Sequence, residues 1–537
     1  MPDVKPPPLP GTVKQPGPIA RLIEQLPNKG APVWRLIQRV DPLETVVNRA
    51  LINRSINVLA PRPSRLSTRL PYTTYETLTD KTFNSRQLQP STNAPRTAPP
   101  ADEVVELFRR RTFIPCEKST VLFAYFAQWF TDGFLRSNRK DETDAPRDIT
   151  KNESTHEIDL AQLYGLDEAE TGMLRDRDNP ILLAHQGPPG AELPPALYDR
   201  DGKRVEQFAN LRVIRPKKIA VDNGELLAMG SDAANIQIGY TMLNTLFLRE
   251  HNRIAREIAA TNPRWEPDRI FGAARSVLTV LLIRIVIEEY INHIHPYRFH
   301  FRLDPHGFRK QPWMRPNWVA VEFNLLYRWH SLIPDRLDIG ADEPVPIADT
   351  AYRAKTLLSN TGLETLIDRA SRQPAGKVGL HNTAEFLLKR AELPSIEAGR
   401  AVNLRGYREY REACKLGRID RFDQITSDKA LAKELKDLYG TVDEVEFFVG
   451  LFAEDPRPNG VLPPLIGRLV GLHAFSQVMT NPLFAPEVYN TETFSECGAE
   501  IIETTRSLGD VVRRNIPHGS PVPEVRLTRV DWRAVKV

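Results

Sequence analysis

The segment at 319–335, VAVEFNLLYRWHSLIPD, places a tyrosine and a histidine at a spacing suited to redox chemistry. Its apolar residues recur with a helical period, so Phe323, Tyr327 and His330 should share one helical face, and Pro334 should end the helix. Imidazole is a common protein ligand of haem iron, and a phenol one turn away could exchange an electron with a porphyrin. The alternative is a hydrogen-bonded core histidine beside a tyrosine that only fills space.

A second candidate is an aromatic helix expected at 119–136. Gln128, Thr131 and Asp132 form a narrow polar strip along it. Polar side chains on an otherwise apolar helix either line a pocket or face solvent. The sequence leaves both interpretations open, so this strip is a candidate site and not an established one.

A third group of reactive side chains crowds one turn of the segment FLREHNRIAREIAATNPRW. Arg249, Glu250, His251 and Arg253 place an acid, an imidazole and two cations within five positions. Such a cluster is usually an ion-pair network that serves the fold and takes no part in catalysis. We therefore expect a structural role for it.

The elements that must position these residues are mostly helices. Apolar residues recur at helical spacing beyond residue 100, whereas strand-like alternation is short, as at 299–303. The fold class is therefore mainly α, with few short strands. Helices are expected at 102–110, 119–136, 234–260, 267–295, 318–333, 428–438 and 498–515.

The N-terminal part is expected to be organised differently, because prolines cluster at 2–18 and at 90–100. Between these clusters, one expected helical face is apolar and the other carries Arg35 and Arg39, so the segment either packs on the core or lies on a membrane surface. The apolar face comprises Val33, Trp34, Leu36, Ile37 and Val40. The expected units are a flexible arm at 1–30, an amphipathic helical segment at 31–65, a connection at 66–100 and one large domain at 101–537.

Composition narrows the function classes. The 537 residues are 41% hydrophobic and 26% charged, which is typical of a globular chain with a large core. The 72 basic and 68 acidic residues leave a charge of +4, too near neutral to indicate a nucleic-acid partner. Cys116, Cys414 and Cys497 form no CxxC pattern, which favours a reducing, cytoplasmic location. The proline-rich start does not resemble a signal peptide, and Arg284 interrupts the most apolar stretch, so no membrane span is expected.

Several motifs together resemble a known family. FLREHNRIA, followed by NPRW, is similar to the animal haem peroxidase superfamily, and EFNLLYRWHSLIPD is similar to its fatty-acid oxygenase branch, the cyclooxygenases. FAQWFTDGF, HEIDLAQLYG, IVIEEYINHIHPYRFHFRLDP and LINRSINV also resemble family segments, in the same order, over residues 40–515. The resemblance implies a large, mainly helical haem domain at 101–537.

The resemblance also implies an activity, that of a bacterial-type, cyclooxygenase-like dioxygenase with non-covalently bound haem b. A Tyr327 radical would remove a hydrogen atom from an unsaturated fatty acid, and O2 would add to give a hydroperoxide. His330 matches the proximal iron ligand and Gln128 the distal glutamine. The alternatives are a haem peroxidase acting on small reductants, and a non-catalytic haem-binding scaffold at a membrane surface. The oligomeric state stays open.

Other matches concern the substrate. Arg54 and Tyr297 match the pair that holds the substrate carboxylate at the channel mouth, where a guanidinium makes charge-assisted hydrogen bonds. An ungapped count back from Asn481 and Pro482 puts Val470 in place of the serine that aspirin acetylates. His473 then replaces a glycine, which implies a reshaped pocket. The residues matched to the channel or its walls are Tyr290, Ile291, Ile294, Phe323, Leu326, Trp329, Val470 and Ala474.

The chain departs from the family pattern around the distal face. Asp132 replaces the distal histidine, and a carboxylate is the weaker base unless burial raises its pKa, so weak peroxidase activity is expected. Thr131 and Ile236 replace the carboxylates that attach haem covalently, and Gly133 replaces a calcium-ligating aspartate, so no calcium is expected. The side chains expected to give Asp132 an apolar setting are Phe126, Trp129, Phe130 and Phe134.

Overall fold

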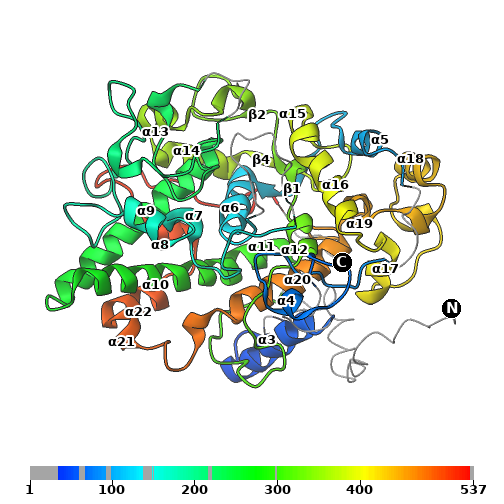
Figure 1. Ribbon diagram of the computed structural model, residues 1–537, viewed down its shortest axis with the longest axis horizontal. Coiled ribbons are helices and arrows are strands. Elements are labelled where there is room, and N and C mark those ends of the chain that lie inside the picture. Colours follow the sequence, from blue (N-terminus) through cyan, green and yellow to red (C-terminus); the bar gives the residue numbers. More distant parts are fainter. Residues whose placement is uncertain are drawn as a thin grey trace.

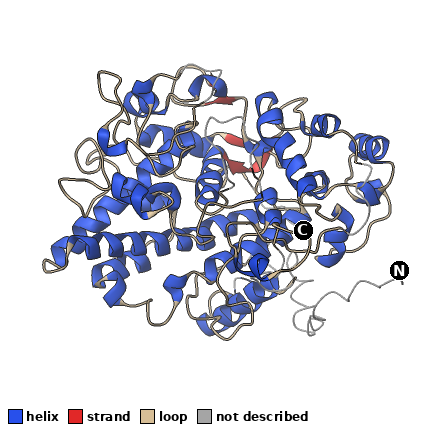
Figure 2. Ribbon diagram, viewed as in Figure 1, coloured by secondary structure: helices blue, strands red, loops and turns tan. Residues whose placement is uncertain are grey.

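The computed structural model describes residues 34, 36–59, 67–91, 98–136, 148, 150–215, 221–296 and 299–532. Helices make up nearly all of the regular structure in this part of the chain, which confirms the mainly α class (Figure 2). The strands form two small antiparallel pairs, β1 (Pro115–Thr120) with β4 (Pro374–Gly376) and β2 (Arg336–Leu337) with β3 (Val345–Pro346). The expected arm at 1–30 lies outside the described residues.

Two long helices form the centre of the fold. α9 (Ile238–Thr261) packs against α10 (Pro267–Ile285), which continues through the π-helical segment η4 (Val286–Ile291) into α11 (Asn292–Ile294). By length and composition, Pro267–Ile294 could cross a membrane, but 83% of its most apolar stretch is buried inside the protein. It is therefore placed as a core helix, and Figure 1 shows α10 between α9 and α22.

Four further helices frame the candidate site. α6 (Val121–Asp132) packs against α9, and both α3 (Asp41–Ile56) and α12 (Val321–Leu326) pack against α20 (Pro464–Met479). Shorter helices surround this framework: α4 (Tyr75–Thr79), α5 (Ala101–Val104), α7 (Ala161–Tyr164), α8 (Glu168–Leu174), α13 (Ala354–Thr361), α14 (Leu363–Arg372), α15 (Glu385–Leu387), α16 (Leu393–Ala401), α17 (Tyr407–Ala413), α18 (Lys429–Tyr439), α19 (Phe447–Ala453), α21 (Thr491–Phe494), α22 (Glu496–Thr504) and α23 (Leu508–Arg514).

The helix expected at 318–333 is much shorter in the structure. α12 ends at Leu326, Tyr327 leaves the helical conformation, and His330 begins a separate 3-10 turn, η5 (His330–Leu332). Tertiary contacts override the helical pattern here, because the Ser331 carbonyl lies against β4 and accepts a hydrogen bond from Asn382. The prediction of one helical face was therefore wrong. The helix expected at 498–515 likewise divides into α22 and α23, with Ser507 capping the second.

The strand-like alternation at 299–303 does not form a strand. Asn292 makes two side-chain bonds to the Phe301 backbone, donating to its carbonyl at 2.9 Å and accepting from its N–H at 2.8 Å. Asn48 does the same for Arg302, at 2.9 and 3.2 Å. Two asparagine side chains thus satisfy the backbone groups that a neighbouring strand would otherwise bind. This arrangement ties the 299–303 segment to α11 and to α3.

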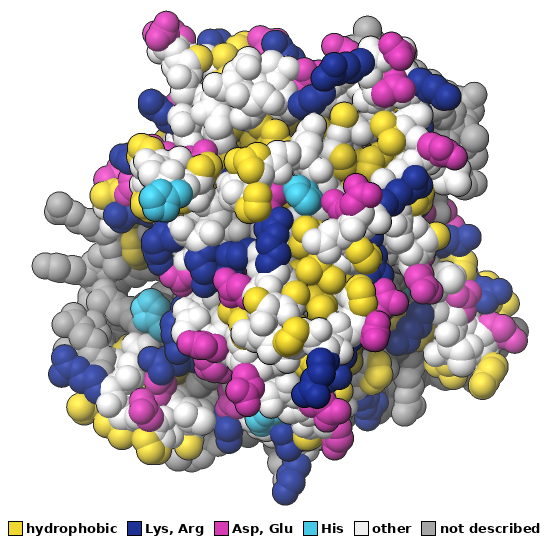
Figure 3. Space-filling view, turned by 90° about the vertical axis from the view of Figure 1, so that its left-hand side faces the viewer, with side chains coloured by type: hydrophobic (Ala, Val, Ile, Leu, Met, Phe, Trp, Pro, Cys, Tyr) yellow, Lys and Arg dark blue, Asp and Glu magenta, His cyan; other side chains and the backbone are white. Residues whose placement is uncertain are grey.

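The amphipathic face expected near the N-terminus is divided. Trp34 is buried against Phe299, with ring centroids 5.8 Å apart, whereas Leu36 and Val40 are exposed. The single apolar face that the sequence predicts is therefore wrong, and Val33 lies outside the described residues. Elsewhere the surface is polar: on the face in Figure 3, acidic and basic side chains are interspersed and hydrophobic side chains form patches between them.

Candidate active site

A cavity of about 450 Å³ collects the residues that the sequence singled out for chemistry. Gln128, Thr131 and Asp132 enter it from α6, and Tyr327 and His330 enter it from the segment that follows α12. The polar strip of α6 therefore lines a pocket, which decides between the two interpretations that its sequence allowed. The side chains from α6 and those from the segment after α12 line the same cavity, although Tyr327 and His330 do not belong to one continuous helix.

The imidazole of His330 is held from behind by a buried carboxylate. His330 Nδ1 lies 3.2 Å from Glu392 Oε1, and Glu392 is 1% exposed. Thr383 Oγ1 donates a hydrogen bond to the same carboxylate oxygen at 2.8 Å. An imidazole that is oriented through one ring nitrogen presents the other nitrogen as a ligand, which is the usual arrangement around metal-binding histidines.

Tyr327 lies in an aromatic stack between the cavity and α20. Its ring stacks on Trp329 at 4.6 Å between centroids and meets the edge of Phe323 at 5.3 Å. Phe323 in turn stacks on His473 of α20 at 4.8 Å. The stack fixes the ring plane of Tyr327 from two sides.

The Tyr327 hydroxyl is buried and has no hydrogen-bond partner of good geometry among the described residues. Burial raises the pKa of Tyr327 above its ordinary value, and the nearby Tyr290 hydroxyl partly offsets this rise. The phenol therefore keeps its proton at neutral pH. Tyr290 lies in the π-helical segment η4, a local distortion often found at functional sites.

The opposite wall of the cavity carries amides and an ion pair. Gln237 Nε2 donates to Gln128 Oε1 at 2.8 Å. Asp132 Oδ2 accepts hydrogen bonds from Arg136 Nη1 at 3.2 Å, from Ser231 Oγ at 3.0 Å and from Tyr240 Oη at 2.9 Å. Three donors, one of them a cation, stabilise the carboxylate form and make it a weak base.

The apolar setting expected for Asp132 is not found. Trp129 stacks on Phe247 at 4.3 Å, and Phe130 packs against Phe134 at 5.2 Å and Tyr290 at 6.0 Å. Phe126 likewise packs against Tyr290, at 5.7 Å. These rings lie on the faces of α6 that turn toward α9 and η4, whereas Asp132 turns toward Arg136. The expectation was wrong because neighbours in sequence point in different directions around a helix.

The side chains that line the larger cavity suit a haem group. His330 and Gln128 line the same space, and most of the other lining side chains are apolar, as a haem pocket requires. Thr131 and Ile236 also line it, and neither offers a carboxylate for covalent attachment. A side chain at Gly133 would collide with the carboxamide of Gln162, which fills the space beside this glycine.

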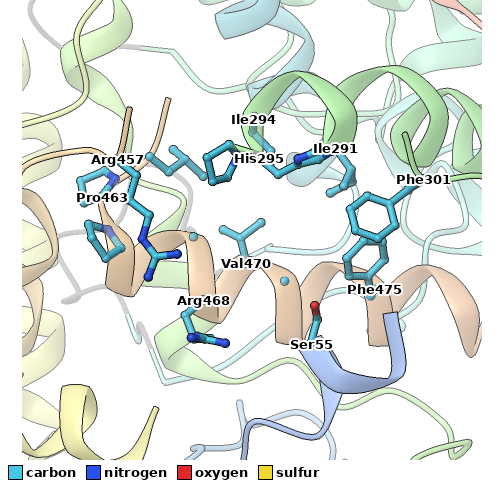
Figure 4. Close-up of a pocket in the computed structure, with 15 residues that line it drawn as sticks. Ser55, Ile291, Ile294, His295, Phe301, Arg457, Pro463, Arg468, Val470 and Phe475 are labelled. Carbon is cyan, nitrogen blue, oxygen red and sulfur yellow. The ribbon is translucent and has the colours of Figure 1, made fainter. Parts of the chain in front are cut away.

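A second, smaller cavity of about 90 Å³ collects part of the expected substrate channel (Figure 4). Ile291, Ile294 and Val470 line it, together with Ser55 of α3. Arg54, half-buried in the last turn of α3, directly precedes Ser55 in the chain but does not line this cavity. Trp329 lines the larger cavity. The expected residues that are buried but line neither of these two cavities are Tyr290, Phe323, Leu326 and Ala474.

Tyr297, the expected partner of Arg54, lies outside the described residues. The cluster on α9 has the structural role that the sequence predicts. Glu250 is fully buried and accepts hydrogen bonds from Arg253 at 2.8 Å and from Asn515 at 2.6 Å, which lower the pKa of its carboxyl. His251 bonds to the Tyr164 hydroxyl at 2.8 Å, and burial lowers its pKa to about 3.

Four residues of the site were not predicted from the sequence: three line the cavities, and the fourth, Glu392, lies behind His330 without lining either cavity. Glu392 and Gln237 come from distant segments, and no local pattern distinguishes them. Arg457 and Arg468 line the smaller cavity, and Arg468 had a usable signal. It is a cation inside the apolar run VLPPLIGRLVGLHAF, where a charged side chain needs a partner or a ligand.

Comparisons with known proteins agree with this arrangement. The chain is 28% identical to prostaglandin G/H synthase 2 of Bos taurus over 499 residues, which covers 90% of this chain and 79% of that protein. It is also 28% identical to prostaglandin G/H synthase 1 of Rattus norvegicus over 491 residues, covering 88% and 77%.

Solved structures show the same fold at lower sequence identity. The fatty acid alpha-dioxygenase of Oryza sativa superposes with a TM-score of 0.66 at 16% identity, covering 93% of this chain and 96% of that chain. Peroxidase A of Dictyostelium discoideum superposes with a TM-score of 0.63 at 19% identity, covering 88% and 96%.

The family itself is shown by a match that covers most of the chain. Residues 131–526 match the animal haem peroxidase family, and this range contains Asp132, Tyr327 and His330. The chain is therefore an oxidoreductase of the animal haem peroxidase family.

Proposed function

We propose that the protein is a fatty-acid dioxygenase that uses Tyr327 to remove a hydrogen atom from an unsaturated fatty acid and adds O2 to the resulting carbon. The observation that carries the proposal is the position of Tyr327. It lines the larger cavity with His330, and its ring is linked through Phe323 to His473, one turn along α20 from Val470 of the smaller, apolar cavity.

His330 would hold haem b from one side of the larger cavity, and Gln128 would face it from the other. Haem bound there would supply the one-electron oxidant that turns the Tyr327 phenol into a phenoxyl radical. The Glu392 carboxylate orients His330, and the aromatic stack holds the Tyr327 ring and excludes water. Thr131 and Ile236 leave such a haem without covalent attachment.

The first Tyr327 radical would need a hydroperoxide, whose reduction at the haem would supply the oxidising equivalent that takes one electron and one proton from the phenol. From then on the cycle consumes only fatty acid and O2. The Tyr327 radical takes one hydrogen atom from an allylic or pentadienyl C–H bond, which restores the phenol and leaves a carbon radical. O2 adds to that carbon to give a peroxyl radical. Return of the hydrogen atom from Tyr327 gives the hydroperoxide and the radical for the next cycle. Because burial favours the protonated phenol, Tyr327 is suited to hydrogen-atom exchange.

The substrate would enter by the smaller cavity, where Ile291, Ile294 and Val470 offer an apolar wall. Prostaglandin G/H synthases and a fatty acid alpha-dioxygenase structure containing palmitic acid are among the similar proteins. Exposed apolar side chains gather on α3 and the residues before it, and they support peripheral contact with a membrane that delivers fatty acid. They are Leu36, Val40, Leu43 and Val46.

Peroxidase chemistry on small reductants is the weaker candidate, because Asp132 is tied to Arg136, Ser231 and Tyr240 and is poorly placed to relay a proton. A non-catalytic scaffold would need no buried tyrosine next to the expected haem ligand. Replacement of Tyr327 by phenylalanine distinguishes these possibilities.

Tyr327→Phe removes a hydroxyl with no well-formed hydrogen bond, so stability should change by no more than about 1 kcal/mol. Haem content should stay the same, and oxygen uptake with linoleate should disappear. Tyr489→Phe, at a half-buried tyrosine packed on Phe484 and Phe494, is the matched control and should keep both properties. Oxygenation that persists in Tyr327→Phe would refute the proposal.

A further inference from the structure

The smaller cavity has an uneven distribution of charge. Its walls are mostly apolar, but two arginines, Arg457 and Arg468, line it as well. Figure 4 shows both guanidinium groups on one side of the cavity, away from Phe301 and Phe475. Arg457 lies in the loop before α20 and is exposed, whereas Arg468 lies on α20 and is half-buried. The cavity therefore has a cationic end and an aromatic end.

Neither guanidinium forms an ion pair or a side-chain hydrogen bond with any described residue. The acidic residues nearest in sequence are engaged elsewhere. Glu454 pairs with Arg411 and accepts from the Leu465 N–H at 2.7 Å, and Asp455 accepts from Thr426 at 2.9 Å. Among the residues that the structure describes, no acidic side chain pairs with the cationic end of the cavity.

The surroundings add positive charge. Lys118 donates from Nζ to the carbonyl of Asn459, two residues after Arg457, at 3.0 Å. Burial lowers the pKa of Lys118 to about 8, so the ammonium is still largely charged at neutral pH. Burial and Lys118 together hold the pKa of the cavity residue His295 well below its usual range, which keeps this imidazole neutral. Unpaired cations beside an apolar wall are costly unless an anion binds between them.

We propose that Arg457 and Arg468 bind the carboxylate of the fatty acid directly, while its alkyl chain lies along Val470, Ile291 and Phe475. This inference rests on the proposed function and adds to it the two residues that anchor the substrate. A carboxylate matches the fork of a guanidinium and makes short, charge-assisted hydrogen bonds.

The anchor also orients the chain. On α20, Arg468 precedes His473 by five residues, which corresponds to about 7.5 Å along a helix axis. His473 stacks on Phe323, which contacts Tyr327. Arg468 shares a face of α20 with Phe475, seven residues further on, so a fatty acid held by Arg468 would run along that face toward the part of α20 that carries His473, whose own side chain lies on another side of the helix.

Binding is best measured with a saturated acid in the haem-loaded Tyr327→Phe protein, so that no turnover interferes. Isothermal titration with palmitate, methyl palmitate and hexadecylamine, all below their micelle concentrations, separates the head group from the chain. Arg468→Gln should raise the Kd of palmitate about 10- to 100-fold, as expected for losing bonds to a charged group. The ester should bind as before. Arg457→Gln should act in the same direction but less strongly, since Arg457 is more exposed.

Arg468→Glu provides a gain of function that a folding defect cannot imitate. It should abolish palmitate binding and make hexadecylamine bind more tightly than it binds to the parent protein. Arg468→Lys should restore part of the palmitate affinity, because the charge remains and the fork is lost. Arg315→Gln, at an exposed arginine outside the cavity, is the control and should change nothing.

Equal effects of Arg468→Gln on the acid and on the ester would overturn the anchor, as would unchanged palmitate binding. If palmitate binding depends on Arg468 but the wild-type protein takes up no oxygen with unsaturated acids, the anchor stands and the dioxygenase proposal fails. If oxygenation is observed and its KM for linoleate is indifferent to Arg468, the dioxygenase stands and the anchor fails. A wild-type protein that binds no fatty acid overturns both.

Discussion

His330 Nδ1 lies 3.2 Å from the buried carboxylate of Glu392, although 61 residues separate the two in the sequence. Glu392 comes from the π-helical segment η7 (Leu388–Glu392), and Thr383 donates a hydrogen bond to the same carboxylate oxygen. A negative charge behind a ligating imidazole increases its electron donation to a metal. In the proposed role of His330 as the iron ligand, Glu392 would set both the direction and the donor strength of the imidazole.

Replacement of Glu392 by glutamine keeps the shape of the side chain and removes its charge. We expect haem affinity to fall by about 10- to 100-fold, which is typical for loss of a partner behind a metal ligand, and the haem midpoint potential to rise. Spectroelectrochemical titration checks both effects. Thr383→Val is the matched control, because it removes a bond to Glu392 but keeps the charge. An unchanged potential in Glu392→Gln would show that the carboxylate does not act on the haem.

His330→Ala should abolish haem binding through iron. Haem titration followed at the Soret band should show loss or a strong shift of the band. His306→Ala, at a histidine stacked on Tyr489 away from the larger cavity, should bind haem normally. A normal Soret band in His330→Ala would remove this residue from the site.

Asp132→His tests the distal wall. The imidazole should act as a general base, and we expect peroxidase turnover to rise by roughly 100-fold, with a shorter lag before oxygenation. Asp132→Asn is the control, because it breaks the same contacts to Arg136, Ser231 and Tyr240 without adding a base. Stopped-flow measurement of peroxide reduction gives the rates. Equal rates in the two variants would mean that position 132 does not face the reacting peroxide.

Glu289 gives a pH dependence of stability. Burial raises the pKa of Glu289 from 4.5 to about 7, and its carboxylate accepts from the Leu508 N–H at 2.7 Å. Between these pH values the folded chain binds more protons than the unfolded chain, so the free energy of unfolding falls as pH rises from about 4.5 to 7. The loss is on the order of 3 kcal/mol and is nearly complete by about pH 8.

Glu289→Gln should therefore stabilise the protein at pH 8 and have little effect at pH 4.5, as measured by urea unfolding at both pH values. Glu288→Gln is the matched control. It breaks ion pairs to Arg284 at 3.2 Å and Arg506 at 3.0 Å, so it should destabilise at pH 8. A Glu289→Gln gain that does not depend on pH would show that burial of the charge is not its cause.

The sequence by itself determined the fold class, the family and the order of the motifs. Helical periodicity is a local property, and it identified α9, α18 and the continuous run of α10, η4 and α11 to within a few residues. The motif around Tyr327 and His330 identified both residues as candidates. The sequence also identified Asp132 as a departure from the family pattern. The motif around it aligns without a gap, so each residue has one counterpart in the family.

Only the tertiary structure decided where these side chains point. In the structure α12 ends before Tyr327, and side-chain hydrogen bonds from Asn292 and Asn48 take the place of an expected strand. Asp132 is hydrogen-bonded to Arg136. The tertiary structure also brought Glu392 behind His330 and placed Arg468 at an apolar cavity with no ion-pair partner among the described residues. Contacts between segments tens or hundreds of residues apart leave no periodic signal in the chain, because they depend on how whole elements pack and not on local spacing.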